Sequence, residues 1–295
     1  MVQSKSFANR LATALIVIVM ILAVALALMP IINTIAISFS TGTAASSGKV
    51  AFWPVDFTLS AYQKILKDGA FWSAFMVSIA RVVIGGGLSI ALTVLMAFPM
   101  SRKTSQFASR NIYMWTLVFA MLFNGGMIPT YMVVYKLGLI NSFWSLVLPT
   151  AINVMNIILM MNFFKGIPSS LEEAAVIDGA SPYRILFSIV LPISLPSIAT
   201  ITLFTVVNYW NEFFNGLIYI NDQTKIPLQT YLQQLALQQQ NMTQLSKEEI
   251  MAMSQISSLS LNSAKILVSM IPVLIIYPLL QKFLVKGLVL GAVKE

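Results

Sequence analysis

Six long runs of apolar residues, separated by shorter polar stretches, dominate the chain. A helix needs about 20 predominantly apolar residues to cross a bilayer, so runs of this length predict membrane-spanning helices. The pattern therefore predicts an all-α membrane protein with six transmembrane helices. The expected spans are residues 11–37, 71–98, 111–135, 142–164, 193–220 and 264–280.

Composition supports this prediction and excludes several kinds of chemistry. The 295 residues are 58% hydrophobic and only 9% charged, whereas soluble domains have about 25% charged residues. The first apolar run is too long for a signal-peptide core and lacks a convincing cleavage site, so we expect it to remain in the protein. The chain has no Cys and no His, which excludes disulfides, the usual zinc sites and the commonest general base.

The distribution of basic residues predicts the orientation in the membrane. Six spans place both termini on one side, together with residues 99–110 and 165–192. These four segments hold ten Lys and Arg, against six in the opposite loops. Because basic residues gather in cytoplasmic loops, we expect both termini in the cytoplasm. The net charge of +8 then reflects membrane topology and anionic lipid, with no need for nucleic acid.

Two long loops are expected on the outer side. Residues 38–70 begin with a flexible stretch and continue as an amphipathic piece that contains Trp53 and Tyr62. Residues 221–263 are rich in Gln and predict a helical excursion, with Ser246 and Glu249 at the spacing of a capping box. We expect residues 1–70 to form an N-terminal segment with the first span and its outer loop, and residues 71–295 to form the core.

A cluster of carboxylates interrupts the apolar pattern in the stretch "EEAAVIDGASPYRILFSIVLP", residues 172–192. Ser170 and Glu173 have the spacing of a capping box, and Glu172 and Glu173 both suit the positive end of a helix dipole. The spacing therefore predicts a short helix that begins near Ser170. On these residues alone, a docking element for another protein and an ordinary solvated connector are both open.

The same stretch predicts a turn and a second helix. Gly179 tolerates the left-handed conformation at a helix end, Ser181 can cap the next helix, and Pro182 suits its first position. The second helix is expected to lead through Pro192 into the fifth span.

The stretch resembles the EAA motif in permease subunits of ABC importers. The matching positions are Glu173, Ala174, Ala175, Gly179, Ile189, Leu191 and Pro192. The stretches "NGGMIPTYMVVYKLGLINSFWSLVLP", "NYWNEFFNGLIYI" and "FLVKGLVLGAVKE" resemble MalG-type sugar permeases, most closely the subgroup for complex plant or algal oligosaccharides. The family often ends in Gly where this chain has Glu295.

The resemblance implies the type I ABC importer permease fold, with a cytoplasmic coupling helix in the loop 166–192. It implies a translocation subunit that is not itself an enzyme and that imports oligosaccharides, including acidic ones that contain uronates. The residues that it implies for coupling to the ATPase are Glu172, Glu173, Ala174, Ala175, Asp178, Gly179, Ala180 and Ser181. The chain has no G-x-x-x-x-G-K-[ST] loop, which fits a permease that borrows its ATPase.

The implied partners are a second homologous permease subunit, two cytoplasmic ATPase subunits and an extracellular solute-binding protein. ATP and Mg²⁺ are expected on the ATPase subunits, and no cofactor or metal on this chain. The implied location is the bacterial cytoplasmic (inner) membrane. Alternatives are an ABC permease for a non-sugar solute, a secondary carrier that uses Glu212, and an intramembrane enzyme, for which Lys265 near Ser263 is only a weak hint.

Polar residues inside spans are costly in lipid and usually face a cavity or a partner helix. Asn208, Asn211 or Glu212, and Asn215 would lie on one face of a continuous fifth helix, among aromatic rings that suit sugars. We expect this face, with Asn153 and Asn156 in the fourth span, to line the pathway; hydrogen bonding between helices, or reception of the binding protein by Glu212, is the alternative. The expected pathway residues are Asn153, Asn156, Asn208, Tyr209, Trp210, Asn211, Glu212 and Asn215.

Other residues inside spans predict packing, bending or an interfacial charge. Asn124 to Gly126, with Pro129, should bend or open the third span. Gly85 to Gly87 predict close helix packing. Arg81 is expected to reach the outer membrane interface, and attraction of an acidic oligosaccharide is the alternative.

Overall fold

The computed structural model describes residues 7–242 and 258–292, and most of these residues are helical. The chain forms two compact units. The first comprises Met1–Gly69 and Gln234–Met270, and the second comprises Ala70–Gln233 and Ile271–Glu295. The expected division at residue 70 stays a prediction, because grouping in space does not test whether a part folds alone.

The described helices are long and apolar enough for up to six membrane spans. Three are single helices, Arg10–Ser38, Gly69–Ser101 and Leu259–Gln281. The other three are pairs of helical segments bent by 116°, 50° and 83°. All six expected spans are therefore present as apolar helical segments, but three of them are broken.

The first unit is built on α1 (Phe7–Ser38) and the first part of α16 (Ser258–Ala292), with the short helices α2 (Gly42–Ser46) and α3 (Ser60–Leu66) between them in the sequence. The exposed side chains of α1 are apolar over most of its length, as expected of a surface in contact with lipid. Lys265 forms an ion pair with Asp68 at 2.7 Å. The hint of a Ser–Lys catalytic pair therefore loses its support, because a carboxylate already holds this ammonium group.

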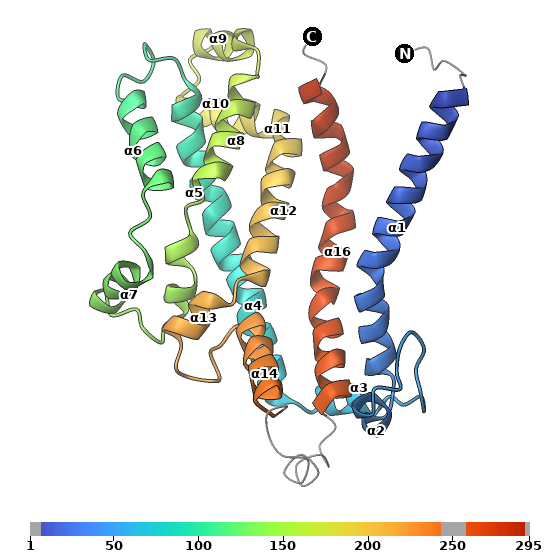
Figure 1. The fold of residues 1–295 in the computed structure, drawn as a ribbon. Helices are drawn as coiled ribbons and strands as arrows, with labels where there is room; N and C mark the ends of the chain where they lie inside the picture. The colour runs from blue at the N-terminus through green and yellow to red at the C-terminus, as the bar shows by residue number, and fades with distance from the viewer. Residues whose placement is uncertain (1–6, 243–257, 293–295) are drawn as a thin grey trace. The chain divides into compact units, whose positions relative to one another are not determined.

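The second unit is built around one long helix that corresponds to the second span. It comprises α4 (Gly69–Ala80), the π-helical turn η1 (Arg81–Gly85) and α5 (Gly86–Ser101). We call Gly69–Ser101 the span-two helix. It packs against α8 (Val154–Lys165) and α12 (Leu195–Asn211), as Figure 1 shows.

Small and flexible apolar side chains fill the core of the second unit. Ala97, Met160, Phe164, Val190 and Ile201 are buried in one cluster. Gly85 allows a close approach, since a Cβ there would lie 2.7 Å from Cε1 of Tyr209. The close packing expected from the glycines is confirmed at Gly85, whereas a Cβ on Gly87 would meet no atom within 4 Å.

The third span is broken where the sequence predicted it. The segments α6 (Arg110–Leu122) and α7 (Met127–Lys136) meet at 116°. Gly126 has a φ of +88°, and its N–H donates to Oδ1 of Asn124 at 2.9 Å. A left-handed glycine and an Asn that bonds the local backbone end one helix and start another.

The fourth and fifth spans also consist of several segments. The fourth contains the 3₁₀ turns η2 (Phe143–Leu146) and η3 (Leu148–Thr150), followed by α8. The fifth begins with α10 (Pro182–Ile185), η4 (Leu186–Val190) and α11 (Leu191–Ile193), turns by 83° before α12, and ends in α13 (Phe214–Tyr219). Part of the predicted helical excursion forms α14 (Leu228–Met242), and its position on the outer side stays a prediction. The capping box expected at Ser246 and Glu249 lies outside the described residues.

Candidate functional site

The acidic stretch forms α9 (Ser169–Ile177), which starts differently from the prediction. Pro168 occupies the N-cap position and no side chain caps the first turn. The capping box of Ser170 and Glu173 was wrong, because the helix begins one residue earlier and Ser170 lies inside it. Glu172 remains in the first turn, where a carboxylate complements the helix dipole.

The end of α9 confirms the predicted glycine turn. Gly179 has a φ of +74°. Its N–H donates to the carbonyl of Val176 at 3.0 Å, and the N–H of Ala180 donates to the carbonyl of Ala175 at 2.9 Å. These two bonds form a Schellman motif, which satisfies the last carbonyls of the helix.

The second predicted cap is also present. Ser181 caps α10 (Pro182–Ile185), and its Oγ accepts a hydrogen bond from the N–H of Arg184 at 3.4 Å. The chain continues through η4 (Leu186–Val190) and α11 (Leu191–Ile193) toward α12. Asp178 is the C-cap residue of α9. The turn therefore joins α9 to the fifth span in a fixed geometry.

Helix α9 buries one face and exposes the other. Ala175 is buried in the core cluster of the second unit. Glu173, Ala174, Val176 and Ile177 are exposed, and Ile177 is 86% exposed. An exposed apolar face next to small side chains is typical of a surface that binds another protein.

A single ion pair connects the buried side of α9 to the span-two helix. The Nη1 of Arg102, which follows the end of α5, donates to Oε2 of Glu172. The guanidinium lies over the ring of Phe98 with 4.4 Å between Cζ and the ring centroid. Its Nε also donates to the carbonyl of Phe98 and to Oγ of Ser101. Burial lowers the pKa of Arg102 from its ordinary value, although a guanidinium remains charged at any physiological pH.

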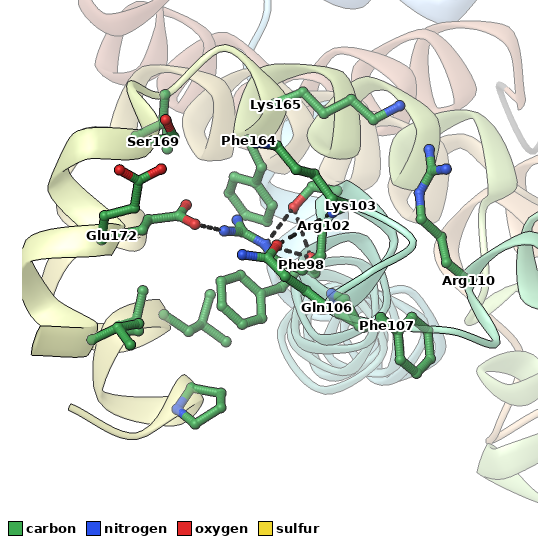
Figure 2. Close-up of a pocket in the computed structure, with 18 of the residues that line it drawn as sticks. Phe98, Arg102, Lys103, Gln106, Phe107, Arg110, Phe164, Lys165, Ser169 and Glu172 are labelled. Carbon is green, nitrogen blue, oxygen red and sulfur yellow. Dashed lines mark hydrogen bonds and ion pairs between the residues drawn. The ribbon is translucent and has the colours of Figure 1, made fainter. Parts of the chain in front are cut away.

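An open pocket of about 1510 Å³ surrounds this ion pair. Figure 2 shows Arg102 and Glu172 joined across it, with Phe98 and Phe164 beside the guanidinium. The other basic residues that line the pocket are Lys103, Arg110 and Lys165. This end of the second unit therefore combines an exposed helix with a mostly apolar pocket whose charged residues are mainly basic.

A second ion pair lies deep inside the same unit. Arg81 is completely buried, and its Nη2 donates to Oε2 of Glu212. Its Nε donates to the carbonyl of Leu146 at 2.9 Å, and its Nη1 donates to the carbonyl of Glu212 at 2.8 Å. The expected position of Arg81 at the membrane interface was wrong, and no exposed surface remains for contact with a sugar.

The comparisons with known proteins agree with this architecture. Residues 89–290 match the family described as binding-protein-dependent transport system inner membrane component. The chain belongs to this family. The permease is 43% identical to the polygalacturonan/rhamnogalacturonan transport system permease protein YtcP of Bacillus subtilis (strain 168), over 97% of this chain and 99% of that protein.

Two further relatives cover nearly the whole permease. Protein LplC of Bacillus subtilis (strain 168) is 38% identical over 92% of this chain and 90% of that protein. Among solved structures, a bacterial ABC transporter involved in the import of the acidic polysaccharide alginate contains a chain that is 33% identical, with a TM-score of 0.85. That match covers 94% of the permease and 98% of the solved chain. The permease therefore has the type I importer fold that its EAA motif implied.

The structure separates the predicted pathway residues of the fifth span. Helix α12 ends at Asn211, Glu212 is extended, and α13 begins at Phe214. The single continuous face that the spacing predicted was therefore wrong. Asn208 and Asn211 are exposed, whereas Tyr209 and Trp210 are buried.

Among the remaining predicted pathway residues, Glu212, Asn153 and Asn156 have partners for their side chains, whereas the buried Nδ2 of Asn215 has no hydrogen-bond partner among the described residues. Oε1 of Glu212 accepts a hydrogen bond from the N–H of Asn215 at 2.7 Å and so caps α13. Asn153 caps α8 by accepting a bond from the N–H of Asn156. The buried Nδ2 of Asn156 donates to Oγ1 of Thr205 in α12 at 3.3 Å. The bond of Asn156 therefore favours a role in holding two helices together over a role in lining the pathway. Asn208 and Asn211 are exposed, as residues that line a pathway must be.

Sequence reasoning missed both arginine partners of the glutamates. Arg102 and Glu172 are 70 residues apart, and Arg81 and Glu212 are 131 apart. The only signal in the sequence was that Arg81 lies within one span and Glu212 within another. Charges in hydrocarbon commonly pair with each other, and this rule could have suggested the inner pair.

Proposed function

We propose that this permease forms one half of the translocation pathway of an ATP-driven importer for acidic oligosaccharides. An extracellular solute-binding protein delivers the sugar, and two ATPase subunits on the opposite side bind ATP with Mg²⁺. Closure of the ATPases moves α9, and the permease changes the side to which its pathway opens. The chain itself translocates and catalyses no covalent step.

The observation that supports this proposal best is the geometry of α9. Its buried side is fixed to the rest of the unit, its exposed side presents Ala174, Val176 and Ile177, and a Schellman turn fixes its end. These features suit a short helix that receives force from a partner. The absence of a phosphate-binding loop from the sequence means that a separate subunit must hydrolyse ATP.

The substrate class follows from the relatives. YtcP is named for polygalacturonan and rhamnogalacturonan, and the solved importer for alginate, described as an acidic polysaccharide. These polymers share uronate units, so we propose oligosaccharides with uronate residues as the substrate. The exposed amides of Asn208 and Asn211 can exchange hydrogen bonds with sugar hydroxyls.

The orientation and partners complete the proposal. The excess of basic residues in the segments around the termini and α9 favours a cytoplasmic position for both termini and for α9. One chain with up to six spans and one coupling helix forms half a translocation pathway, so a second, homologous permease subunit completes it.

Reconstitution provides the direct test. The permease would be assembled in liposomes with its partner permease, the ATPases and the binding protein. ATP would be supplied on the side of the membrane that carries the ATPases, and ATP supplied only on the opposite side would serve as the control. We expect ATP-dependent uptake of an oligogalacturonate, and little uptake of a neutral oligosaccharide of equal length. Preference for the neutral sugar would contradict the substrate class, and uptake of neither sugar would favour a non-sugar solute.

A secondary carrier is the other class of function to be tested. Such a carrier needs a carboxylate in the membrane that can release and rebind a proton or cation. Glu212 is the candidate from the sequence, but Arg81 and the N–H of Asn215 hold both of its oxygens. Uptake driven by an ion gradient in the absence of ATP would support the carrier instead.

A further inference from the structure

We propose that the span-two helix transmits the movement of α9 to the break in the fifth span, with Arg102 and Arg81 as the positioning residues at its two joints. The inference rests on the proposed function, because it assumes that α9 receives force from an ATPase. It adds a second route between coupling helix and pathway, distinct from the covalent route through α10, η4 and α11.

The first joint connects α9 to the end of α5. Arg102 and Glu172 form the ion pair, and their side chains are only 14% and 15% exposed. Because Arg102 also bonds the carbonyl of Phe98 and lies over the Phe98 ring, its guanidinium has little freedom to follow Glu172 without moving α5. A charged hydrogen bond of this kind is stronger than a neutral one.

The span-two helix is suited to transmit this movement. It is helical without interruption over 33 residues from Gly69 to Ser101. Arg81 and Arg102 lie about 31 Å apart along it, from a rise of about 1.5 Å per residue. Ala97 and Met100 anchor its C-terminal half in the core cluster shared with α8 and α12.

The second joint connects this helix to two broken spans. Arg81 belongs to the π-helical turn η1, and it bonds the carbonyl of Leu146 in η2 and both the carbonyl and carboxylate of Glu212. One guanidinium therefore joins irregular backbone from the second, fourth and fifth spans. Glu212 in turn caps α13, so a shift of Arg81 moves the start of α13.

The covalent route is less suited to the same task. It turns by 83° at Ser194, between Pro182–Ile193 and Leu195–Asn211. Ser194 donates to the carbonyls of Val190 and Leu191, and its own carbonyl accepts a hydrogen bond from the N–H of Ile198 at 2.9 Å, so all of its bonds join residues no more than four positions apart. A bend stabilised only by local bonds can change angle and absorb a displacement, whereas an uninterrupted helix passes it on.

The test uses the complete importer and removes only the first joint. Arg102→Gln and Glu172→Gln would be compared with wild type for sugar taken up per ATP hydrolysed. Coupling between two sites commonly changes an affinity by about 5- to 150-fold, and we expect uptake per ATP to fall at least about fivefold. Co-purification of the ATPases with the Arg102→Gln variant should stay at the wild-type level, because Arg102 lies outside α9 and the exposed face of α9 is unchanged.

Two further variants separate a positioning role from loss of folding. Arg102→Glu combined with Glu172→Arg restores opposite charges and should recover part of the coupling. Lys136→Gln removes an exposed cation at the end of α7 and should leave uptake per ATP unchanged. Wild-type thermal stability in the single variants would confirm that the loss is not one of folding.

A spectroscopic measurement reports the far end of the route. The chain has no Cys, so Leu217→Cys, on the exposed side of α13, gives a single site for a spin label in this chain. ATP should change the label spectrum in wild type, and Arg102→Gln should abolish the change while ATP is still hydrolysed. An unchanged response and unchanged uptake per ATP in the variants would overturn this inference and leave the proposed function intact. Absence of ATP-driven uptake in wild type would overturn the proposed function and the inference together.

Discussion

The second unit contains two arginine–glutamate pairs, one at each joint of the span-two helix, and they differ mainly in their surroundings. Arg81 is 1% exposed in its side chain and Glu212 is 17% exposed. Arg102 and Glu172 are 14% and 15% exposed and border an open pocket. The same chemical pair therefore occurs once inside the protein and once at its edge.

This difference decides what each pair can do. A buried pair is held by the cost of leaving either charge alone, so it suits a joint that stays closed. A pair beside solvent loses less when it opens, because water and salt screen both charges. We therefore expect loss of the Arg81 pair to destabilise the permease more than loss of the Arg102 pair.

Removal of the buried arginine should have the largest effect. Arg81→Met leaves the Glu212 carboxylate without its partner, and breaking a buried pair costs about 3–5 kcal/mol. The thermal midpoint of the purified importer should fall far more than in Arg102→Met. Equal losses in the two variants would contradict the comparison. Arg81→Met combined with Glu212→Leu should recover much of the loss, since apolar replacement of a whole buried pair is often nearly neutral.

Added volume beside the buried pair should have the next largest effect. In Gly85→Ala the new methyl group would lie 2.7 Å from Cε1 of Tyr209 and 3.2 Å from Cγ2 of Val147. Tyr209 is buried and cannot easily move, so we expect a loss of about 1–3 kcal/mol from overpacking. Gly87→Ala is the matched control, because its methyl group would meet no atom within 4 Å. Similar thermal midpoints for both variants would show that the site adapts.

Strain in the turn after α9 should have a smaller effect on stability but a clear effect on assembly. Gly179→Val places a β-branched residue at a φ of +74°, which costs about 1–2 kcal/mol. Because this turn fixes the end of α9, co-purification of the ATPases should decrease. Gly179→Asn is the control, since Asn tolerates this conformation. Undiminished assembly of the Val variant would show that the turn does not position α9.

The exposed pair of Asp222 and Lys225 extends the comparison to full solvent contact and should have the smallest effect. Hydrogen bonds from the Thr224 side chain and backbone lower the pKa of Asp222. A carboxylate with a lowered pKa stabilises the fold above its ordinary pKa and loses that contribution as the pH falls through the lowered value. The difference in thermal midpoint between wild type and Asp222→Asn should therefore be visible at pH 7, begin to shrink near pH 4 and vanish only as the pH falls through the lowered pKa. A difference that grows in acid would contradict this assignment.

The sequence predicted the local features well because each depends on neighbouring residues. The six apolar segments, the break near Gly126, the left-handed turn at Gly179 and the cap at Ser181 all follow from local preferences. The capping box at Ser170 failed for a local reason too, since Pro168 starts the helix one residue earlier. The family and the helix α9 were also predicted, because the EAA motif lies within one short stretch, and the coupling role of α9 stays a prediction.

The sequence did not predict which distant residues meet. A helical face was expected to join Asn208 to Asn215, but Glu212 leaves the helix in order to reach Arg81 and to cap α13. Hydrophobic periodicity shows that a segment is apolar and long, and it does not show where a backbone break satisfies a buried charge from another span. For this reason the burial of Arg81 and its pairing with Glu212 could not be predicted from the residues next to Arg81 in the sequence.

The sequence alone determined that this protein is a helical membrane permease with a short helix that ends in a glycine turn, because burial in lipid and the conformational limits of Gly and Pro act residue by residue. Only the tertiary structure decided which carboxylate pairs with which arginine, and hence that Arg81 is buried while Arg102 borders the pocket. Those pairings depend on the relative positions of spans 70 to 131 residues apart, and the packing of the whole unit fixes these positions.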